Sequence, residues 1–425
     1  MKRALLHLTM LIFACTVAVG QSQYKVLYSF GALGTGDGYN PVAGFVYRAG
    51  VLYGVTQFGG SEGCYYAIPG CGTVFAMQTF DNSVTEAVIY SFCPSGDPSN
   101  CPDGLQPTGG LIADQAGNLY GTTYWGGTGN SCGQFGGCGT VFELTQVSKE
   151  AWSETVLHSF TGSDGFGPVG LTFDGVGNLY GTTEAGGAYG AGDVFELSPG
   201  LGGTWTLTTL HDFDPATTDG GGPNAGVTFN SVGNLYGTTA FGGGTGCNAR
   251  PKGCGTVFQL APNGDGTWTE DIIYRFRGEQ RYPLSGVTFD KSGNLYGTTE
   301  GDDGTHSWGG VFQLISESGT WKESSFQFDG SDGLEPAAAV VLQGSALFGT
   351  TIASTNCPIG DCGNVFEIQG GKEIVLYNFC PLGSPCLDGY HPAVGGPLLA
   401  GQGSLYGATR AGGTYGGGVI FQITP

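Results

Sequence analysis

The chain has 425 residues, of which 83 are glycine; 40% of the residues are hydrophobic and only 12% are charged. This composition argues against a charged disordered chain and against a helical bundle, and it favours strands joined by turns. The formal net charge of −21 argues against nucleic acids and anionic membranes as partners, because both attract basic surfaces.

The first twenty residues have the basic start, apolar run and small-residue cleavage site of a secretory signal peptide that ends before Gln21. We therefore expect the mature chain, 21–425, to be secreted or extracellular, with the periplasm as the alternative. Loss of the two basic residues of the signal changes the formal charge from −21 to −23. A second interpretation takes Ile12-Phe13-Ala14-Cys15 as a lipoprotein cleavage site. No later stretch has the roughly 18 uninterrupted apolar residues that a membrane-spanning helix needs.

One phrase, Gly-Asn-Leu-Tyr-Gly-Thr-Thr, recurs along the mature chain. Its four full copies contain Tyr120, Tyr180, Tyr236 and Tyr296, and weaker copies surround Tyr53, Phe348 and Tyr406. The seven copies follow one another at a period of about sixty residues.

Three further phrases recur in step with it, and each predicts a short strand bounded by turn residues. The first is an apolar run after a proline, such as Gly170-Leu171-Thr172-Phe173, and the second contains Val-Phe or, in the last unit, Ile420-Phe421. The third ends in phenylalanine, at Phe30, Phe92, Phe160, Phe213, Phe276, Phe328 and Phe379. Asp-x-x-Gly-Asn turns before the Gly-Thr-Thr strand and Gly-Gly pairs after it are predicted to be structural.

Seven units of four strands predict an all-β fold, a seven-bladed β-propeller with four antiparallel strands per blade, as a single domain. The chain starts with a lone copy of the Phe-ending strand at 24–30 and stops at Pro425, after the Val-Phe strand of the last unit. We expect the N-terminal strand to complete the last blade, which closes the ring and leaves no open sheet edge.

Twelve cysteines remain after Cys15, and each has a near neighbour in sequence. In a secreted chain this predicts six local disulfides: Cys64–Cys71, Cys93–Cys101, Cys132–Cys138, Cys247–Cys254, Cys357–Cys362 and Cys380–Cys386. Zinc is the alternative, but it needs four convergent ligands, and these pairs are scattered over the predicted ring. All six pairs fall in connections that emerge on one face of an up-and-down propeller. We call this the stapled face and expect binding there, because rigid loops often carry function.

The residue directly after each Gly-Thr-Thr strand does not repeat. The residues at this position are Gln57, Tyr124, Glu184, Ala240, Glu300, Ile352 and Arg410, and the next position adds Phe58, Trp125 and Phe241. Rings for stacking beside carboxylates and an arginine suit a sugar or a small molecule. The candidate ligand-binding residues are therefore Gln57, Phe58, Tyr124, Trp125, Glu184, Phe241, Glu300 and Arg410. The alternative is that these side chains only fill gaps between unlike loops.

Carboxylates offer a second set of candidates. An Asp-Gly dipeptide precedes the first strand of six blades, at Asp37, Asp103, Asp164, Asp219, Asp332 and Asp388, where it predicts a turn or, alternatively, a shared cation site. Glu300, Asp302 and Asp303 form an isolated acidic cluster, and they are weak metal candidates because their spacing matches no calcium loop. We predict no cofactor, with a divalent cation as the alternative.

The unit without Asp-Gly carries Arg275, Arg277 and Arg281, which attract an anionic ligand or form a plain charged surface. His158 and His211 take the place of a tyrosine or phenylalanine in the Phe-ending strand, so we expect them to be packing residues. The sequence contains no nucleophile elbow, zinc-protease helix, phosphate loop or dinucleotide fingerprint.

The clearest copy of the repeat runs from Gly177-Asn178-Leu179-Tyr180-Gly181-Thr182-Thr183 through Gly186-Gly187 to Asp193-Val194-Phe195-Glu196-Leu197. This pattern resembles the GloVer tandem-repeat family of secreted bacterial proteins over essentially the whole mature chain. The resemblance implies an extracellular or surface protein and no established activity. A looser likeness, to gluconolactonase and streptogramin-lyase propellers, implies a channel-facing divalent metal, for which only Glu184 and Glu300 could be offered here.

Two hypotheses follow for the function. The first is a monomeric extracellular binding or scaffold module, more an interaction protein than an enzyme, that recognises a glycan or a protein through the stapled face. The alternative is a metal-dependent lactonase or lyase that acts on a small molecule or a polysaccharide. A carboxylate cluster at the channel mouth would favour the enzyme, and a broad aromatic surface would favour the binding module.

Overall fold

A computed structural model describes residues 22–425 except 33, 35, 61–62, 65–69, 81–82, 130–131, 133–135, 245–246, 248–252, 279–280, 302–307, 318, 337, 361, 394–397 and 402. The predicted signal peptide, 1–20, and the metal candidates Asp302 and Asp303 lie outside the described residues. No described helix is long and apolar enough to cross a membrane.

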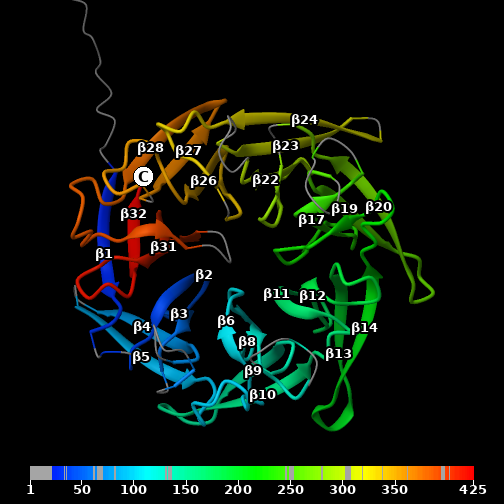
Figure 1. Cartoon of the computed structure of the whole chain (residues 1–425), viewed down its shortest axis with the longest axis horizontal. Helices are drawn as coiled ribbons and strands as arrows, with labels where there is room; N and C mark the ends of the chain where they lie inside the picture. Colours follow the sequence, from blue (N-terminus) through cyan, green and yellow to red (C-terminus); the bar gives the residue numbers. More distant parts are fainter. Residues whose placement is uncertain are drawn as a thin grey trace, which may run out of the picture.

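The chain forms a seven-bladed β-propeller, as the repeats predict, with the blades arranged in chain order around a central channel (Figure 1). Blade 1 contains β2 (Tyr39–Arg48), β3 (Val51–Phe58), β4 (Thr73–Phe80) and β5 (Ser83–Ser91). Blade 2 contains β6 (Leu105–Pro107), β7 (Ile112–Ala113), β8 (Leu119–Trp125), β9 (Thr140–Gln146) and β10 (Trp152–Ser159). Blade 3 contains β11 (Phe166–Phe173), β12 (Leu179–Ala185), β13 (Asp193–Pro199) and β14 (Trp205–Asp212), with the 3-10 turn η1 (Leu201–Gly203) before its last strand.

The other four blades follow the same plan. Blade 4 contains β15 (Gly220–Gly221), β16 (Thr228–Phe229), β17 (Leu235–Thr239), β18 (Phe241–Gly242), β19 (Thr256–Pro262) and β20 (Trp268–Arg275). Blade 5 contains β21 (Thr288–Phe289), β22 (Leu295–Thr299), β23 (Gly310–Glu317) and β24 (Thr320–Gln327). Blade 6 contains β25 (Val341–Gln343), β26 (Ala346–Thr351), β27 (Asn364–Gln369) and β28 (Lys372–Asn378). Blade 7 contains β29 (Tyr390–Pro392), β30 (Leu399–Gly401), β31 (Ser404–Ala411), β32 (Val419–Thr424) and β1 (Gln23–Ser29).

The N-terminal strand closes the ring. Strand β1 pairs antiparallel with β32, from Gln23 opposite Thr424 to Ser29 opposite Val419, and becomes the outermost strand of blade 7. This confirms the prediction that the lone Phe-ending strand completes the last blade. The closure joins both ends of the described chain by backbone hydrogen bonds and covers the edge of β32.

The innermost strand is not continuous in every blade. In blades 2 and 7 it is split into two short pieces, and in blade 4 the piece β15 pairs only with β18. The residues between the pieces of blade 2 include Thr108, Gly109 and Gly110, which line the channel and do not continue the ladder. Glycine loses more conformational freedom than other residues on joining a strand, so these stretches are weak ladder formers.

A repeated aromatic contact joins each blade to the next. The last residue of each Phe-ending motif meets the phenylalanine of the following blade's Val-Phe strand, with ring centroids 5.1–5.3 Å apart. The glycine of each Gly-Thr-Thr lies against the second ring, and a Cβ at Gly181 would lie 2.5 Å from Phe195 Cζ. The repeated Gly and Phe are therefore packing partners, and burial of these rings is the main stabilising feature of each joint.

Candidate functional site

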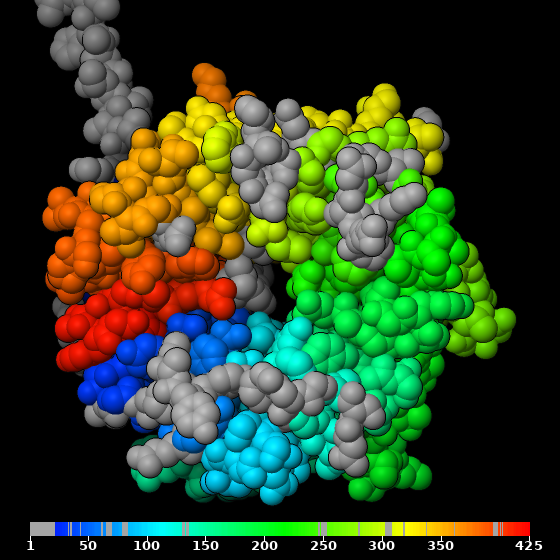
Figure 2. Space-filling model, viewed as in Figure 1, coloured from blue at the N-terminus to red at the C-terminus, as the bar shows by residue number. Residues whose placement is uncertain are grey.

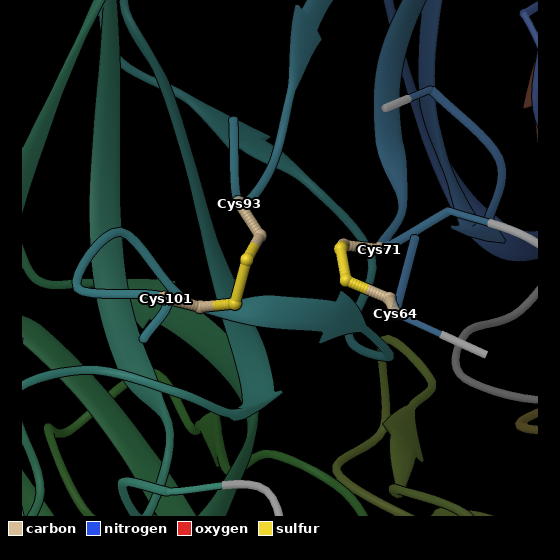
Figure 3. A group of neighbouring side chains, drawn as sticks. All are labelled: Cys64, Cys71, Cys93 and Cys101. Atoms are coloured by element: carbon tan, nitrogen blue, oxygen red, sulfur yellow. A yellow bond between two sulfur atoms is a disulfide. The ribbon is translucent and has the colours of Figure 1, made fainter. Parts of the chain in front are cut away.

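The stapled face carries all six predicted disulfides, with Cα–Cα distances of 4.7–5.5 Å. Four of them lie between the second and third strands of a blade, and two lie between consecutive blades. The antiparallel order of each sheet places all these connections on the same side of the ring. The expectation that the pairs are scattered is wrong for two of them: Cys64–Cys71 and Cys93–Cys101 lie side by side (Figure 3).

The Asp-Gly residues organise the blade joints, which confirms their structural interpretation. In the first joint the carboxylate of Asp37 accepts a hydrogen bond from the Tyr28 hydroxyl at 2.9 Å and others from the backbone amides of Gly31 and Ala32. Asp103 and Asp388 accept in the same way from Tyr90 and Tyr377. The aspartates thereby satisfy the backbone at the end of the Phe-ending strand.

The two strand histidines do more than pack, which corrects the sequence-based expectation. His158 Nε2 lies 2.9 Å from Asp164 Oδ2, and His211 Nε2 lies 3.0 Å from Asp219 Oδ2. Each histidine therefore replaces the tyrosine hydroxyl of the other joints as the partner of the aspartate. Burial by itself raises the pKa of Asp164, but the hydrogen bonds from His158 and Thr161 outweigh it and hold that pKa at about 2.

A glutamate from the next blade's outer strand faces the aspartate in several joints. Burial, followed by the charge of Asp103, raises the pKa of Glu154 to about 8. Burial and Asp332 likewise raise the pKa of Glu373 to about 8, and burial and Asp37 raise that of Glu86 to about 7. Burial and the neighbouring negative charge both favour the protonated form of these glutamates.

One joint gathers nitrogen and oxygen donors that could hold a divalent cation. His211, Asp219 and Glu270 each offer a ligand atom, and these atoms lie within 4.8 Å of one another. Asp219 already accepts hydrogen bonds from His211 and from the amides of Asp214 and Gly220. His211 therefore satisfies Asp219 rather than Glu270, and burial together with the charge of Asp219 raises the pKa of Glu270 to about 7.

The aromatic candidates Tyr124 and Trp125 form a cluster with Phe166, which the sequence reasoning did not single out. The ring centroids are 5.2 Å apart for Tyr124–Trp125, 5.1 Å for Tyr124–Phe166 and 4.8 Å for Trp125–Phe166. Trp125 ends β8 of blade 2, whereas Phe166 begins β11 of blade 3, so the cluster spans a joint. Phe166 directly follows Asp164-Gly165, and this position could have been compared across the blades in the same way as the one after Gly-Thr-Thr.

Two cavities meet at this aromatic cluster. The first, of about 690 Å³, lies in the central channel, and its walls are mostly glycine and aliphatic residues. Its polar residues are Thr108, Tyr124, Glu184, Asn224, Thr228, Ser285 and Thr288. The second, of about 620 Å³, lies between blades 2 and 3 and is lined by Trp125, Phe166 and Ser163. Figure 2 shows the ring hollowed at its centre. Burial and the neighbouring Glu184 raise the pKa of Tyr124, so its hydroxyl stays protonated and can donate a hydrogen bond.

The remaining candidates do not converge on this cluster. Arg410 Nη2 donates to Gln57 Oε1 at 3.3 Å across the joint between blades 7 and 1, and burial lowers the pKa of Arg410. Phe241 lies against Gly221 and Gly222 of its own blade. Phe58 ends β3 on blade 1, opposite Tyr39 of β2. Glu300 donates its backbone amide to Tyr282 O at 3.1 Å, and neither group of three or more donors in the described residues includes Glu184 or Glu300.

Comparison with known families gives one match. The model of the Gloeobacter/Verrucomicrobia repeat matches residues 70–249 and 244–425. No curated protein matches the sequence.

Several solved structures are similar to this chain at low sequence identity. An ulvan lyase of a polysaccharide lyase family, solved with -[GlcA(1-4)Rha3S]- bound, has a TM-score of 0.52 and 11% identity, with 91% of this chain and 93% of that one covered. PorZ, a surface component of the type-IX secretion system of Porphyromonas gingivalis, has a TM-score of 0.49 and 14% identity over 91% of this chain, which spans only 46% of PorZ. The periplasmic gluconolactonase of Pseudomonas aeruginosa has a TM-score of 0.48 and 15% identity, with 79% and 84% covered.

Proposed function

This chain belongs to the Gloeobacter/Verrucomicrobia repeat family, and we propose that it is an extracellular binding module that recognises an oligosaccharide at its stapled face. The six disulfides support an oxidising compartment outside the cytoplasm. The loops that they close are held on a rigid ring, which is a suitable support for a preformed site.

The observation that carries the proposal is the Tyr124–Trp125–Phe166 cluster between two cavities. All three rings are half-buried, so each keeps part of its surface in water. Sugars present flat apolar faces edged with hydroxyl groups, and an aromatic surface beside polar groups matches both features. A chain of two or three sugar units can lie over the cluster, with one end in each cavity.

Polar groups beside the aromatic cluster would orient a bound sugar. The Glu184 carboxylate accepts hydrogen bonds from sugar hydroxyls, the Tyr124 hydroxyl donates, and the Asn224 side chain does both. The carboxylate disfavours an acidic sugar in the channel cavity, because two negative charges would face each other there. We therefore propose a neutral oligosaccharide as the ligand.

A lactonase or lyase reaction requires more than this site offers. A metal-dependent enzyme of this kind needs several ligands for one cation, and Glu184 is the one carboxylate among the described residues that line the channel cavity. The enzyme hypothesis is kept as the alternative, and the same samples test it.

The test is isothermal titration of the mature chain with a panel of neutral and uronic-acid oligosaccharides, with and without calcium or EDTA. We expect a neutral oligosaccharide to bind, and we expect Trp125→Ala to weaken its binding at least about tenfold. Trp308→Ala is the matched control, because Trp308 is a partly exposed tryptophan outside both cavities. Equal loss in both variants, or no binding across the panel, would overturn the proposal, and a metal-dependent cleavage product would favour the enzyme.

A further inference from the structure

Two disulfides from different connections meet at the joint between blades 1 and 2 (Figure 3). Cys64–Cys71 closes the connection from β3 to β4, and Cys93–Cys101 closes the connection from β5 to β6. The four Sγ atoms lie within 4.8 Å of one another. The exposed fractions of the four residues are 9%, 0%, 0% and 3%, in chain order, so the cluster is enclosed by protein.

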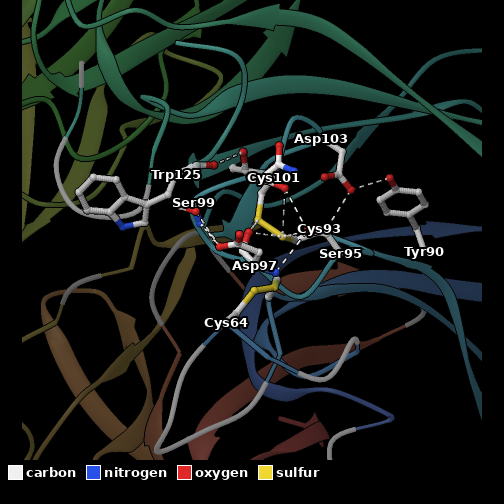
Figure 4. The surroundings of a disulfide bond; sticks show 12 residues. Cys64, Tyr90, Cys93, Ser95, Asp97, Ser99, Cys101, Asp103 and Trp125 are labelled. Carbon is white, nitrogen blue, oxygen red and sulfur yellow. Dashed lines mark hydrogen bonds between the residues drawn. A yellow bond between two sulfur atoms is a disulfide. The ribbon is translucent and has the colours of Figure 1, made fainter. Parts of the chain in front are cut away.

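The two loops approach closely because Gly63 of one loop lies against Gly96 of the other. The amide of Cys64 donates to Gly96 O at 3.1 Å, which ties one loop to the other. Gly63 has φ +118°, and a Cβ on it would lie 2.2 Å from that same Gly96 oxygen. On the other side, the Asp97 carbonyl oxygen lies 3.4 Å from Cys93 Sγ and 3.1 Å from Cys101 Sγ (Figure 4).

Blade 6 carries the same two staples and provides an internal comparison. Cys357–Cys362 and Cys380–Cys386 occupy the equivalent connections, from β26 to β27 and from β28 to β29. Their four sulfur atoms do not form a comparable group within the described part of the chain. Two staples on one blade therefore do not by themselves bring four sulfur atoms together.

We propose that Cys64, Cys71, Cys93 and Cys101 are a redox-gated zinc site, with two disulfides in the oxidised chain and a four-thiolate Zn²⁺ site in the reduced chain. Zinc in closed sites takes four ligands in a tetrahedron, with Zn–S bonds of about 2.3 Å, so neighbouring sulfur atoms are about 3.8 Å apart. Four buried sulfur atoms within 4.8 Å of one another need only small side-chain rotations to reach that geometry.

The chemistry balances with a dithiol as the reductant. Each disulfide accepts two electrons and two protons and its S–S bond breaks, while one dithiol is oxidised to its own disulfide. Zn²⁺ then forms four Zn–S bonds and displaces four protons from the four thiols. Exchange with two molecules of a small disulfide reverses both steps: each small disulfide takes up two electrons and two protons, the two protein disulfides re-form and the ion is released. The site would therefore bind zinc only while both disulfides are reduced, and it would exclude zinc from the oxidised chain that the proposed extracellular setting favours.

The experiment uses the full mature chain, reduced under anaerobic conditions with a phosphine and titrated with Co²⁺ and then Zn²⁺. We expect one equivalent of Co²⁺ to give the intense absorption bands of a tetrahedral thiolate site, and Zn²⁺ to displace it. Cys71→Ser should lose these bands, whereas Cys362→Ser, which breaks the equivalent staple of blade 6, should retain them. The oxidised chain should bind no Co²⁺ with these bands.

A second measurement on the unmutated chain does not depend on whether a variant folds. In the reduced protein with one equivalent of Zn²⁺, Cys64, Cys71, Cys93 and Cys101 should resist alkylation at least about tenfold longer than the cysteines of blade 6, as counted by peptide mass spectrometry. Equal alkylation of the two sets, or Co²⁺ bands that persist in Cys71→Ser, would overturn the proposal.

Discussion

Replacing Glu154 with glutamine should make the protein more resistant to alkaline pH. Glu154 on blade 2 faces Asp103, whose Oδ2 accepts a hydrogen bond from Tyr90 at 2.8 Å. Asp103 Oδ1 and Glu154 Oε1 are both buried and have no hydrogen-bond partner in the described structure. A proton on Glu154 neutralises one charge of this pair, and glutamine keeps the shape of that neutral form.

The sign and size follow from the pKa of Glu154, which rises from its ordinary 4.5 to about 8. A raised pKa means that the folded chain holds a proton that the unfolded chain has lost. The associated stability is therefore complete below about pH 4.5 and is lost as the pH rises to about 8. The full shift would correspond to about 5 kcal/mol. Because water reaches part of Glu154, we expect screening to reduce this to about 1–2 kcal/mol.

The assay is urea unfolding of the oxidised chain at pH 4.5 and pH 8.5. Glu154→Gln and the unmutated chain should have similar unfolding free energies at pH 4.5, and at pH 8.5 the variant should be more stable by about 1–2 kcal/mol. Glu150→Gln is the control, because Glu150 is an exposed glutamate in the turn before the same strand. The reasoning fails if Glu154→Gln gains no stability between the two pH values, or if the control gains as much.

Two further predictions concern the packing of blade 3 and the hydrogen bond between His158 and Asp164 at the joint between blades 2 and 3. Gly181→Ala should lower the free energy of unfolding by about 1–3 kcal/mol in the same assay, because the new Cβ would lie 2.5 Å from Phe195 Cζ, whereas Gly175→Ala, with nothing within 4 Å, should be neutral. His158→Phe should cost about 1–2 kcal/mol at pH 7, because Asp164 loses its partner. Because the pKa of Asp164 is lowered to about 2, its stabilising effect is present above about pH 4 and is lost as the pH falls through 2. The loss of unfolding free energy in His158→Phe should therefore shrink at low pH. His158→Tyr should restore the hydrogen bond to Asp164.

The repeats made the ring and the closing strand predictable, because these features depend on contacts that recur in every unit, and the disulfides were predictable because each cysteine has a near neighbour in sequence. Gly181 and Phe195 illustrate this: the repeated glycine is needed wherever the repeated ring packs against it. The broken inner strands were not predictable, because the innermost strand of each blade pairs on one side only and has no strand on its channel side that would require a regular ladder. The close approach of the Cys64–Cys71 disulfide to the Cys93–Cys101 disulfide depends on Gly63 and Gly96. These glycines belong to loops without a repeated pattern, so the sequence did not predict this contact.

The candidate site was predictable only in part for the same reason. Variation after the Gly-Thr-Thr strand identified Tyr124, Trp125 and Glu184, which the structure brings to two adjoining cavities. The same criterion also selected Phe241, which contacts two glycines of its own blade, and Arg410, which donates a hydrogen bond to Gln57 of the next blade. A position that varies between the repeats thus marks either a ligand contact or a side chain that fills a gap between unlike loops. The neighbour across the joint distinguishes a ligand contact from a gap-filling residue. Phe166 adds a second half-buried ring beside Trp125, whereas Gln57 accepts a hydrogen bond from Arg410.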